Sequence, residues 1–212
     1  MIGAGGWQAM RPPPAFPGMR IGLFGGSFDP FHEGHRLVAM EALKRLRLDT
    51  VWILVTPGNP LKDRSGLPPL AQRMADAHRV IDHPRIRVTG FEAARGFTYS
   101  YETVAWLRRR YPGVDFVWIM GGDSLRSFHR WQRWRDMARL VPIAVHARPG
   151  SVRIAPRSRA AQWLDDVRIP EDEAATLAGS TPPAWTYLTG VVSGQSSTAI
   201  RARRLALGGS SD

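Results

Sequence analysis

The sequence predicts a single α/β domain built on a doubly wound parallel sheet. Short apolar runs alternate with amphipathic segments along most of the chain, and two of these runs end in paired glycines. At 212 residues with 43% apolar side chains, the chain can bury one core of ordinary size. The alternation of apolar runs with amphipathic segments, and the glycine pairs that end two of those runs, favour strands and helices in alternation. This is the pattern of a parallel sheet covered on both faces.

The first unit of this pattern spans residues 20–56. Apolar runs at 20–26 and 51–56 predict two buried strands. Between them, over 34–48, Leu37, Met40, Leu43 and Leu46 recur at three-residue steps, which predicts a helix with one apolar face. A strand, a helix and a second strand in this order require a parallel pair with a right-handed crossover.

The later elements follow from the same two patterns. A loop rich in Pro and Gly at 57–69 precedes a predicted helix near 70–81, and a short strand at 86–91 precedes a helix near 100–110. The second glycine pair ends an apolar strand within 114–125. Further on, we expect a helix over 131–140, a strand within 141–150, and a last strand, loop and helix over 185–207. Residues 151–184 show no clear pattern.

Composition limits the kinds of protein that this chain can be. Residues 1–19 are rich in Gly and Pro and lack the charged and apolar regions of a signal peptide, so we expect a flexible tail there and the folded domain over 20–212, with Met19 as an alternative start. No apolar run approaches the ~18 residues of a membrane span. The absence of cysteine excludes disulfides and thiolate metal sites, and a cytoplasmic protein fits.

The net charge of +11, from 29 basic and 18 acidic residues, predicts that the surface attracts polyanions. Nucleotides, phosphorylated metabolites and nucleic acid all remain open on charge alone. A nucleic-acid-binding module is one alternative, because the chain also has eight tryptophans, but its basic residues are scattered and no known nucleic-acid motif occurs. We therefore expect no nucleic-acid partner.

Residues 24–35, FGGSFDPFHEGH, carry the densest chemistry in the sequence. Gly25 and Gly26 allow a tight turn and a close approach to a ligand, and a helix that begins near residue 33 or 34 directs free N–H groups to the same place, where anions bind well. His32 on the loop and His35 in the first helical turn could donate hydrogen bonds to a phosphate chain. Polar capping is the ordinary alternative for such histidines.

Two other chemistries for this stretch are weaker. Asp29, His32 and His35 could form a metal triad, but the i,i+4 pattern of zinc helices is absent and no second cluster supplies ligands. Ser27 beside His32 could be a nucleophile and its base, but the sequence does not match G-x-S-x-G. Neither a Walker A motif nor G-x-G-x-x-G occurs, so a nucleoside triphosphate would be held by histidines, amides and other cations.

The stretch GGSFDPFHEGH resembles the nucleotidyltransferase pattern G-[ST]-F-D-P-x-H-x-G-H of a Rossmann-like family that joins a nucleoside triphosphate to a phosphate ester. SSTAIR at 196–201 is similar to the second motif of that family, S-S-T-x-I-R. Within the family, segments 56–62, 98–104, 118–134 and 145–150 resemble the bacterial nicotinate-mononucleotide adenylyltransferases. Adenylyltransferases for phosphopantetheine and cytidylyltransferases share the first motif and are the nearer alternatives, although the GGDSL segment with its following tryptophan argues against them.

This resemblance implies an activity and its substrates. The enzyme would transfer the adenylyl group of ATP to nicotinate mononucleotide, giving nicotinate adenine dinucleotide and pyrophosphate in NAD biosynthesis. Mg²⁺ would arrive on the ATP phosphates and would not be held by a protein metal site. The resemblance says nothing of oligomeric state.

The resemblance also implies roles for individual residues. For ATP, the loop wall would be Gly25, Gly26, Ser27 and Phe28, and the triphosphate contacts would be His32, His35, Lys62, Ser197, Thr198 and Arg201, of which His32, His35, Lys62 and Arg201 would be catalytic. For the second substrate, Ser100 would lie at the nicotinate carboxylate, Asp123 would bind a ribose and Trp131 would stack on the pyridine ring. Without the motif, a solvated Lys62, a helix-start Ser100 and a packing role for Trp131 are the ordinary expectations.

Overall fold

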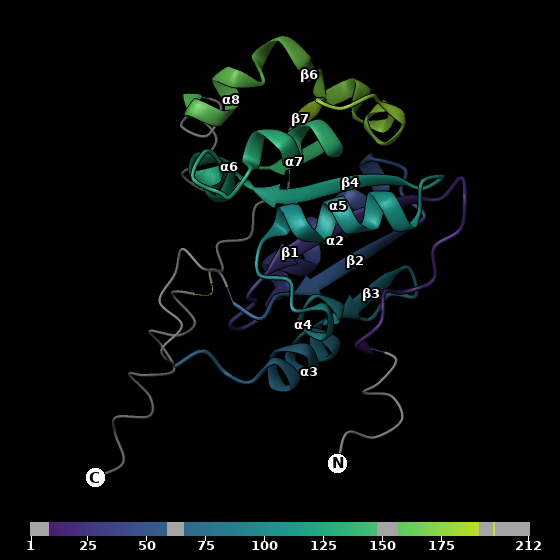
Figure 1. Ribbon diagram of the computed structural model, residues 1–212, viewed down its shortest axis with the longest axis vertical. Helices are drawn as coiled ribbons and strands as arrows, with labels where there is room; N and C mark the ends of the chain where they lie inside the picture. The colour runs from purple at the N-terminus through teal and green to yellow at the C-terminus, as the bar shows by residue number, and fades with distance from the viewer. Residues whose placement is uncertain (1–8, 59–65, 148–156, 191–196, 198–212) are drawn as a thin grey trace.

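A parallel sheet forms the centre of the molecule (Figure 1). The computed structural model describes residues 9–58, 66–147, 157–190 and 197. Within this part of the chain the sheet has seven strands in the order β3-β2-β1-β4-β5-β7-β6, and every neighbouring pair is parallel. The strands are β1 (Arg20–Gly26), β2 (Thr50–Val55), β3 (Ile86–Thr89), β4 (Asp115–Gly121), β5 (Ile143–His146), β6 (Arg168–Ile169) and β7 (Trp185–Leu188).

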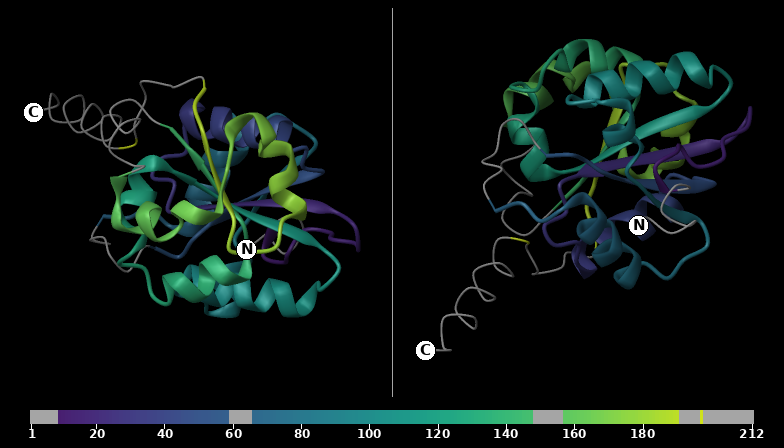
Figure 2. Two further views of the ribbon diagram at one scale, coloured as in Figure 1. Left: turned by 90° about the horizontal axis from the view of Figure 1, so that it is seen from above. Right: turned by 60° about the horizontal axis from the view of Figure 1, so that its bottom comes forward.

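Helices cover both faces of the sheet (Figure 2). One face packs on α2 (Glu33–Arg45), α3 (Leu70–Val80) and the 3₁₀ segment η3 (Glu171–Gly179). The other packs on α4 (Phe91–Arg95), α5 (Ser100–Arg110), α6 (Gly122–Phe128), α7 (Trp134–Leu140) and α8 (Arg159–Trp163). A short 3₁₀ turn, η2 (Asp165–Val167), follows α8. Successive strand residues alternate between the two cores, as Trp52 and Ile53 do, because side chains in a strand point to opposite faces.

This arrangement confirms the predicted doubly wound α/β fold in one domain. The chain runs outward from β1 through β2 and β3, and then returns to place β4 on the other side of β1. The ends of β1 and β4 therefore form the switch point at which sheets of this kind bind ligands. None of the described helices is both long and apolar enough to cross a membrane.

Several element boundaries differ from the expected ones. The helix expected over 131–140 begins only at Trp134, so Trp131 lies in the preceding turn. The strand expected over 86–91 ends at Thr89, and α4 follows it directly. Of the second glycine pair, Gly121 ends β4 and Gly122 begins α6, so no loop separates the two elements. Residues 151–184, which had no readable pattern, include α8, η2, β6 and η3.

Residues 9–19 differ from the flexible tail that their composition predicts. The Thr89 hydroxyl donates hydrogen bonds to the carbonyls of Ala9 and Arg11, both at 3.0 Å, and the Gly90 N–H donates to the Ala9 carbonyl at 2.9 Å. Met10 packs against the core on one face of the sheet. Backbone carbonyls make these contacts, and because every residue has one, composition gives no sign of them.

Candidate active site

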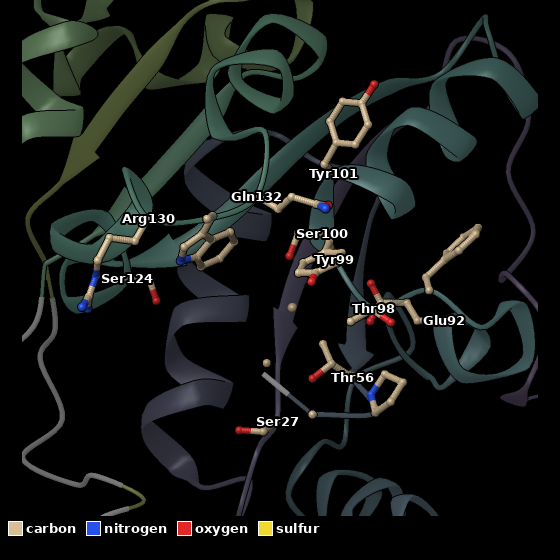
Figure 3. A pocket seen from close by; sticks show the side chains of 16 residues that line it. Ser27, Thr56, Glu92, Thr98, Tyr99, Ser100, Tyr101, Ser124, Arg130 and Gln132 are labelled. Atoms are coloured by element: carbon tan, nitrogen blue, oxygen red, sulfur yellow. The ribbon is translucent and has the colours of Figure 1, made fainter. Parts of the chain in front are cut away.

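A cavity of about 270 Å³ opens at the switch point (Figure 3). Its walls come from the ends of β1 and β2, from α4 and the start of α5, and from the turns around α6. The lining residues are 25–27, 56–58, 92, 97–101, 124 and 130–132. Of the predicted site residues, Gly25, Gly26, Ser27, Ser100 and Trp131 lie in this wall.

Close packing explains both glycines at the end of β1. A side-chain carbon at Gly25 would lie 2.8 Å from Cη2 of Trp118, and one at Gly26 would lie 3.0 Å from the Phe28 ring. Neither glycine has a positive φ; that conformation belongs to Phe28, at 47°. The expected tight turn is therefore made by Phe28, whose buried ring packs behind the cavity wall instead of lining it.

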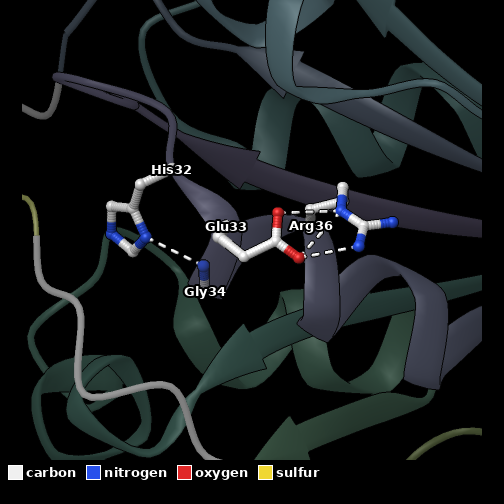
Figure 4. Close-up of polar contacts among 4 residues, drawn as sticks. All are labelled: His32, Glu33, Gly34 and Arg36. Carbon is white, nitrogen blue, oxygen red and sulfur yellow. Dashed lines mark hydrogen bonds and ion pairs between the residues drawn. The ribbon is translucent and has the colours of Figure 1, made fainter.

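His32 and His35 lie at the start of α2, and Figure 4 shows His32 beside the Gly34 N–H. The Gly34 N–H donates to Nδ1 of His32 at 3.1 Å, and the His32 N–H donates to Nδ1 of His35 at 3.3 Å. Since a ring nitrogen that accepts a hydrogen bond carries no proton, each neutral imidazole bears its proton on Nε2. The two rings lie 3.9 Å apart between centroids and are buried. Their capping role and their predicted phosphate role thus use different nitrogens.

Other side chains fix the charge and position of this helix end. The Glu33 carboxylate in the first turn pairs with the Arg36 guanidinium, which the dashed lines of Figure 4 mark. The His35 ring is packed by Phe28 and Phe31, with centroids 5.0 and 5.1 Å away. Aromatic packing therefore holds the imidazole in one orientation, which is what a site for a phosphate chain requires.

The second motif meets the first. The Ser197 hydroxyl donates to the Pro30 carbonyl at 3.2 Å, across 167 positions of sequence. Lys62, Thr198 and Arg201, the other predicted contacts to the triphosphate, lie outside the described residues.

Arg73 holds the two loops of the cavity together. This α3 side chain is 2% exposed, and its guanidinium donates to the carbonyls of Ser27 at 2.6 Å and Thr56 at 2.9 Å, and to that of Pro68 at 2.9 Å. Burial lowers the pKa of this guanidinium, while Asp29 opposes that shift. The sequence reasoning missed Arg73 because a single arginine in an amphipathic helix is usually a solvated charge.

The start of α5 faces the same cavity. The Glu102 carboxylate accepts hydrogen bonds from the N–H groups of Thr98 and Tyr99, at 2.8 and 2.9 Å. In the part of the chain that the structure describes, the N–H groups of Ser100 and Tyr101 have no such acceptor. These two donors, at the N-terminus of an 11-residue helix, suit an anionic group in the cavity.

Trp131 and Asp123 lie in different places. Trp131 lines the cavity, and edge contacts with Trp118 and Phe128, at 6.3 and 5.3 Å between centroids, hold its ring. Asp123 is exposed in the first turn of α6 and lines a separate hollow with Arg126, His129 and Arg130. Arg130 borders both spaces.

Glu92 is a buried acid in the cavity wall that the sequence reasoning also missed. It is 4% exposed and accepts a 2.5 Å hydrogen bond from the Thr103 hydroxyl. Burial raises the pKa of this carboxyl to about 7, and the Thr103 bond opposes the shift. An acid with a shifted pKa in a cavity wall is common in binding sites, so Glu92 is a candidate functional residue.

No group of three His, Cys, Asp or Glu side chains among the described residues is placed to hold a metal ion. This finding removes the candidate triad of Asp29, His32 and His35.

The chain is similar in sequence to known proteins over most of its length. The sequence profile of the cytidylyltransferase-like family matches residues 23–203. A Methylorubrum extorquens protein named "Probable nicotinate-nucleotide adenylyltransferase" is 55% identical over 185 residues, which span 87% of this chain and 100% of that protein. A protein of the same name from Rhizobium johnstonii is 53% identical over 184 residues, which span 87% and 92%.

Solved structures share the fold at low sequence identity. Plasmodium falciparum nicotinic acid mononucleotide adenylyltransferase complexed with APC superposes with a TM-score of 0.63 at 15% identity, over 87% of this chain and 83% of that one. The same protein complexed with NaAD gives a TM-score of 0.61 at 14% identity, over 86% and 82%.

Proposed function

This chain belongs to the cytidylyltransferase-like family and, within it, to the nicotinate-nucleotide adenylyltransferases, and from that membership we propose that it transfers the adenylyl group of ATP to nicotinate mononucleotide. The products are nicotinate adenine dinucleotide and pyrophosphate, in NAD biosynthesis. Because the chain has no cysteine that an oxidising compartment could pair, we also place this activity in the cytoplasm.

One observation carries the proposal. The cavity of about 270 Å³ has Trp131 in its wall and extends to Ser27, on the loop that leads into the start of α2 at His32 and His35. A mononucleotide has an aromatic ring at one end and a phosphate at the other. This site has an aromatic side chain, Trp131, in the cavity and a helix N-terminus, which suits a phosphate, beyond it. We infer that Trp131 stacks on the pyridine ring while the phosphates of both substrates meet at the start of α2.

The reaction needs alignment more than it needs a base. A phosphate oxygen of nicotinate mononucleotide attacks the α-phosphorus of ATP, a new P–O bond forms, and the bond between that phosphorus and the bridging oxygen to the β-phosphate breaks. Pyrophosphate leaves with the electron pair of the broken bond. Because the attacking phosphate is already ionised at neutral pH, the protein acts by positioning two polyanions and by stabilising the charge that moves onto pyrophosphate.

Several groups of this chain are suited to that stabilisation. We propose that the Nε2–H groups of His32 and His35 donate to the triphosphate, together with the N–H groups at the start of α2. Lys62, Ser197, Thr198 and Arg201 complete the set in this proposal, and Asp123 contacts a ribose. Mg²⁺ carried by the ATP phosphates would neutralise part of their charge.

The start of α5 supports a preference for the acid over nicotinamide mononucleotide. A nicotinate carboxylate presents two acceptors to the N–H groups of Ser100 and Tyr101, whereas an amide turns its NH₂ toward one of them. A buried donor left without a partner costs ~1–3 kcal/mol, so we expect at least about tenfold discrimination in kcat/KM.

The test is pyrophosphate release from Mg-ATP with a panel of acceptors. Nicotinate mononucleotide should be the best acceptor, and phosphopantetheine should give only background release. If phosphopantetheine is preferred, or if CTP replaces ATP, a related transferase is the better assignment. A salt-sensitive gel shift with RNA or DNA, combined with no release of pyrophosphate, would favour the nucleic-acid-binding alternative.

A further inference from the structure

Glu92 is placed to contact the ligand in the cavity. It lies on α4, at the part of the wall formed with Thr98, Tyr99 and Ser100, where we place the pyridine carboxylate (Figure 3). At 4% exposure this side chain is more than nine-tenths buried. A carboxyl so deeply buried needs hydrogen-bond partners for both oxygens.

The protein supplies a partner for one of those oxygens. Oε1 accepts from the Thr103 hydroxyl at 2.5 Å, whereas Oε2 has no hydrogen bond within the described part of the chain. Since Glu92 also lines the cavity, its second oxygen is available to a bound molecule. This buried, half-satisfied carboxyl is an observation independent of the helix end at Ser100.

The protonation state of Glu92 decides which group it can bind. A neutral carboxyl keeps accepting from Thr103 at Oε1 and donates its proton from Oε2, so it matches a carboxylate, which only accepts. An ionised Glu92 can only accept, so it repels a carboxylate and matches an amide NH₂.

We propose that Glu92 is a specificity-determining residue: in its neutral form it donates a hydrogen bond to the carboxylate of nicotinate mononucleotide, and in its ionised form it accepts one from the amide of nicotinamide mononucleotide. This inference rests on the proposed function. It adds to the two N–H groups of α5 a third contact, and this contact makes the choice between acid and amide depend on pH.

The environment of Glu92 places its titration in the physiological range. Burial raises the pKa of Glu92 to about 7, and the hydrogen bond from Thr103 acts in the opposite direction. Burial and this bond, and not a neighbouring charge, therefore set the protonation of Glu92. The surrounding elements carry further charged and titratable groups. These are Arg95 on α4, Tyr99 just before α5, Tyr101 and Glu102 on α5, Arg73 on α3, Arg130 in the cavity wall, Arg133 over the Tyr101 ring, and Arg11 in the N-terminal segment.

The expected effect has a definite sign. Below pH 7 Glu92 is mostly neutral and the acid is preferred; as the pH rises through about 7 the carboxyl ionises and the preference declines. The ratio of kcat/KM for nicotinate mononucleotide to that for nicotinamide mononucleotide should fall by about tenfold or more between pH 6 and pH 8.5. Titration of the 5′-phosphate cancels in this ratio because both substrates carry one.

The principal variant is Glu92→Gln. Its amide oxygen can accept from Thr103 while its NH₂ donates into the cavity at every pH, so the variant should prefer the acid with a ratio that changes less than about twofold over the same range. Glu102→Gln is the matched control. It removes a carboxylate from the first turn of the neighbouring helix α5 and should keep the pH slope of the wild type.

A second variant tests the same inference if Glu92→Gln does not fold. Thr103→Val removes the hydrogen bond that favours the ionised carboxyl, so the midpoint of the ratio should move to higher pH. Any one of three results would overturn the inference. The wild-type ratio of kcat/KM values does not change with pH, the Glu92→Gln ratio changes with pH as the wild-type ratio does, or the midpoint of the ratio in Thr103→Val stays where it is in the wild type. If the wild type releases no pyrophosphate with either mononucleotide, the proposed function itself fails.

Discussion

Replacing Arg73 by methionine is the most direct test of how the site is held together. The guanidinium bonds three backbone carbonyls, of which those of Ser27 and Thr56 belong to cavity-lining residues on separate loops. Methionine fills a similar space but donates no hydrogen bond. Arg73→Met therefore removes the link between the loops that follow β1 and β2, with little change in packing volume.

The size of the effect follows from the burial of the three bonds. Hydrogen bonds to a charged group contribute ~1.5–3 kcal/mol each, and breaking a buried charged network costs about 3–5 kcal/mol in total. In a chain of this length ~1 kcal/mol corresponds to about 2–4 °C, so the melting temperature should fall by roughly 6–20 °C. A displacement of about 1 Å in the loops would lower kcat/KM by ~10²-fold.

The assays are calorimetry and steady-state pyrophosphate release at a temperature where the variant is folded. Arg79→Met is the control, because Arg79 lies on the same helix with its side chain 75% exposed, and its change should stay within ~0.5 kcal/mol. Arg73→Lys should recover part of both losses, since an ammonium group can reach some of the carbonyls. Unchanged melting would refute the stabilising role of Arg73, and a large loss of stability with unaltered kcat/KM would refute its positioning role.

Three further predictions concern the helix start, the N-terminal segment and the buried acid. His35→Ala should lower turnover by roughly 10²-fold, because one charge-stabilising donor contributes ~2.7–4 kcal/mol, and near-normal turnover would contradict the phosphate role of His35. A chain that begins at Met19 should melt about 5–10 °C below one that begins at Ala9, because it lacks the Ala9 and Arg11 carbonyls that accept hydrogen bonds from Thr89 and Gly90. Equal melting temperatures would show that these hydrogen bonds do not stabilise the fold. The raised pKa of Glu92 favours the neutral carboxyl, so its stabilising effect is complete below the unfolded pKa of ~4.3 and is lost as the pH rises through about 7. Urea denaturation at pH 5 and pH 8 should show the wild type losing roughly 3 kcal/mol relative to Glu92→Gln, and a pH-independent difference would contradict the burial argument.

The parts of the site that sequence could predict are those set by near neighbours in the chain. His32 and His35 are three residues apart, which is the spacing of a helix cap and the third helical residue, and the structure has them in these two positions. Gly25 and Gly26 end an apolar strand, and they line the cavity at the predicted edge of the sheet. Strand and helix periods record which face of each element is buried, and this was enough for the fold class.

The ends of helices and of the ordered segment were harder to predict from the sequence, because they depend on packing. Trp131 was expected inside a helix, and it lies instead in the turn before α7, where contacts with Trp118 and Phe128 hold its ring. The Gly and Pro content of residues 9–19 predicted a loose tail, and hydrogen bonds to Thr89 and Gly90 hold that segment.

The sequence by itself determined the parallel α/β architecture, the position of the helix start at His32 and His35, and the family to which the chain belongs, because each depends on a local pattern of residue types. Only the tertiary structure decided that Arg73 joins the carbonyls of two loops and that Glu92 is buried beside Thr103. The reason is physical. A backbone carbonyl accepts in the same way whatever its side chain is, and burial depends on elements brought together from distant parts of the chain, so neither leaves a pattern that can be read along the sequence.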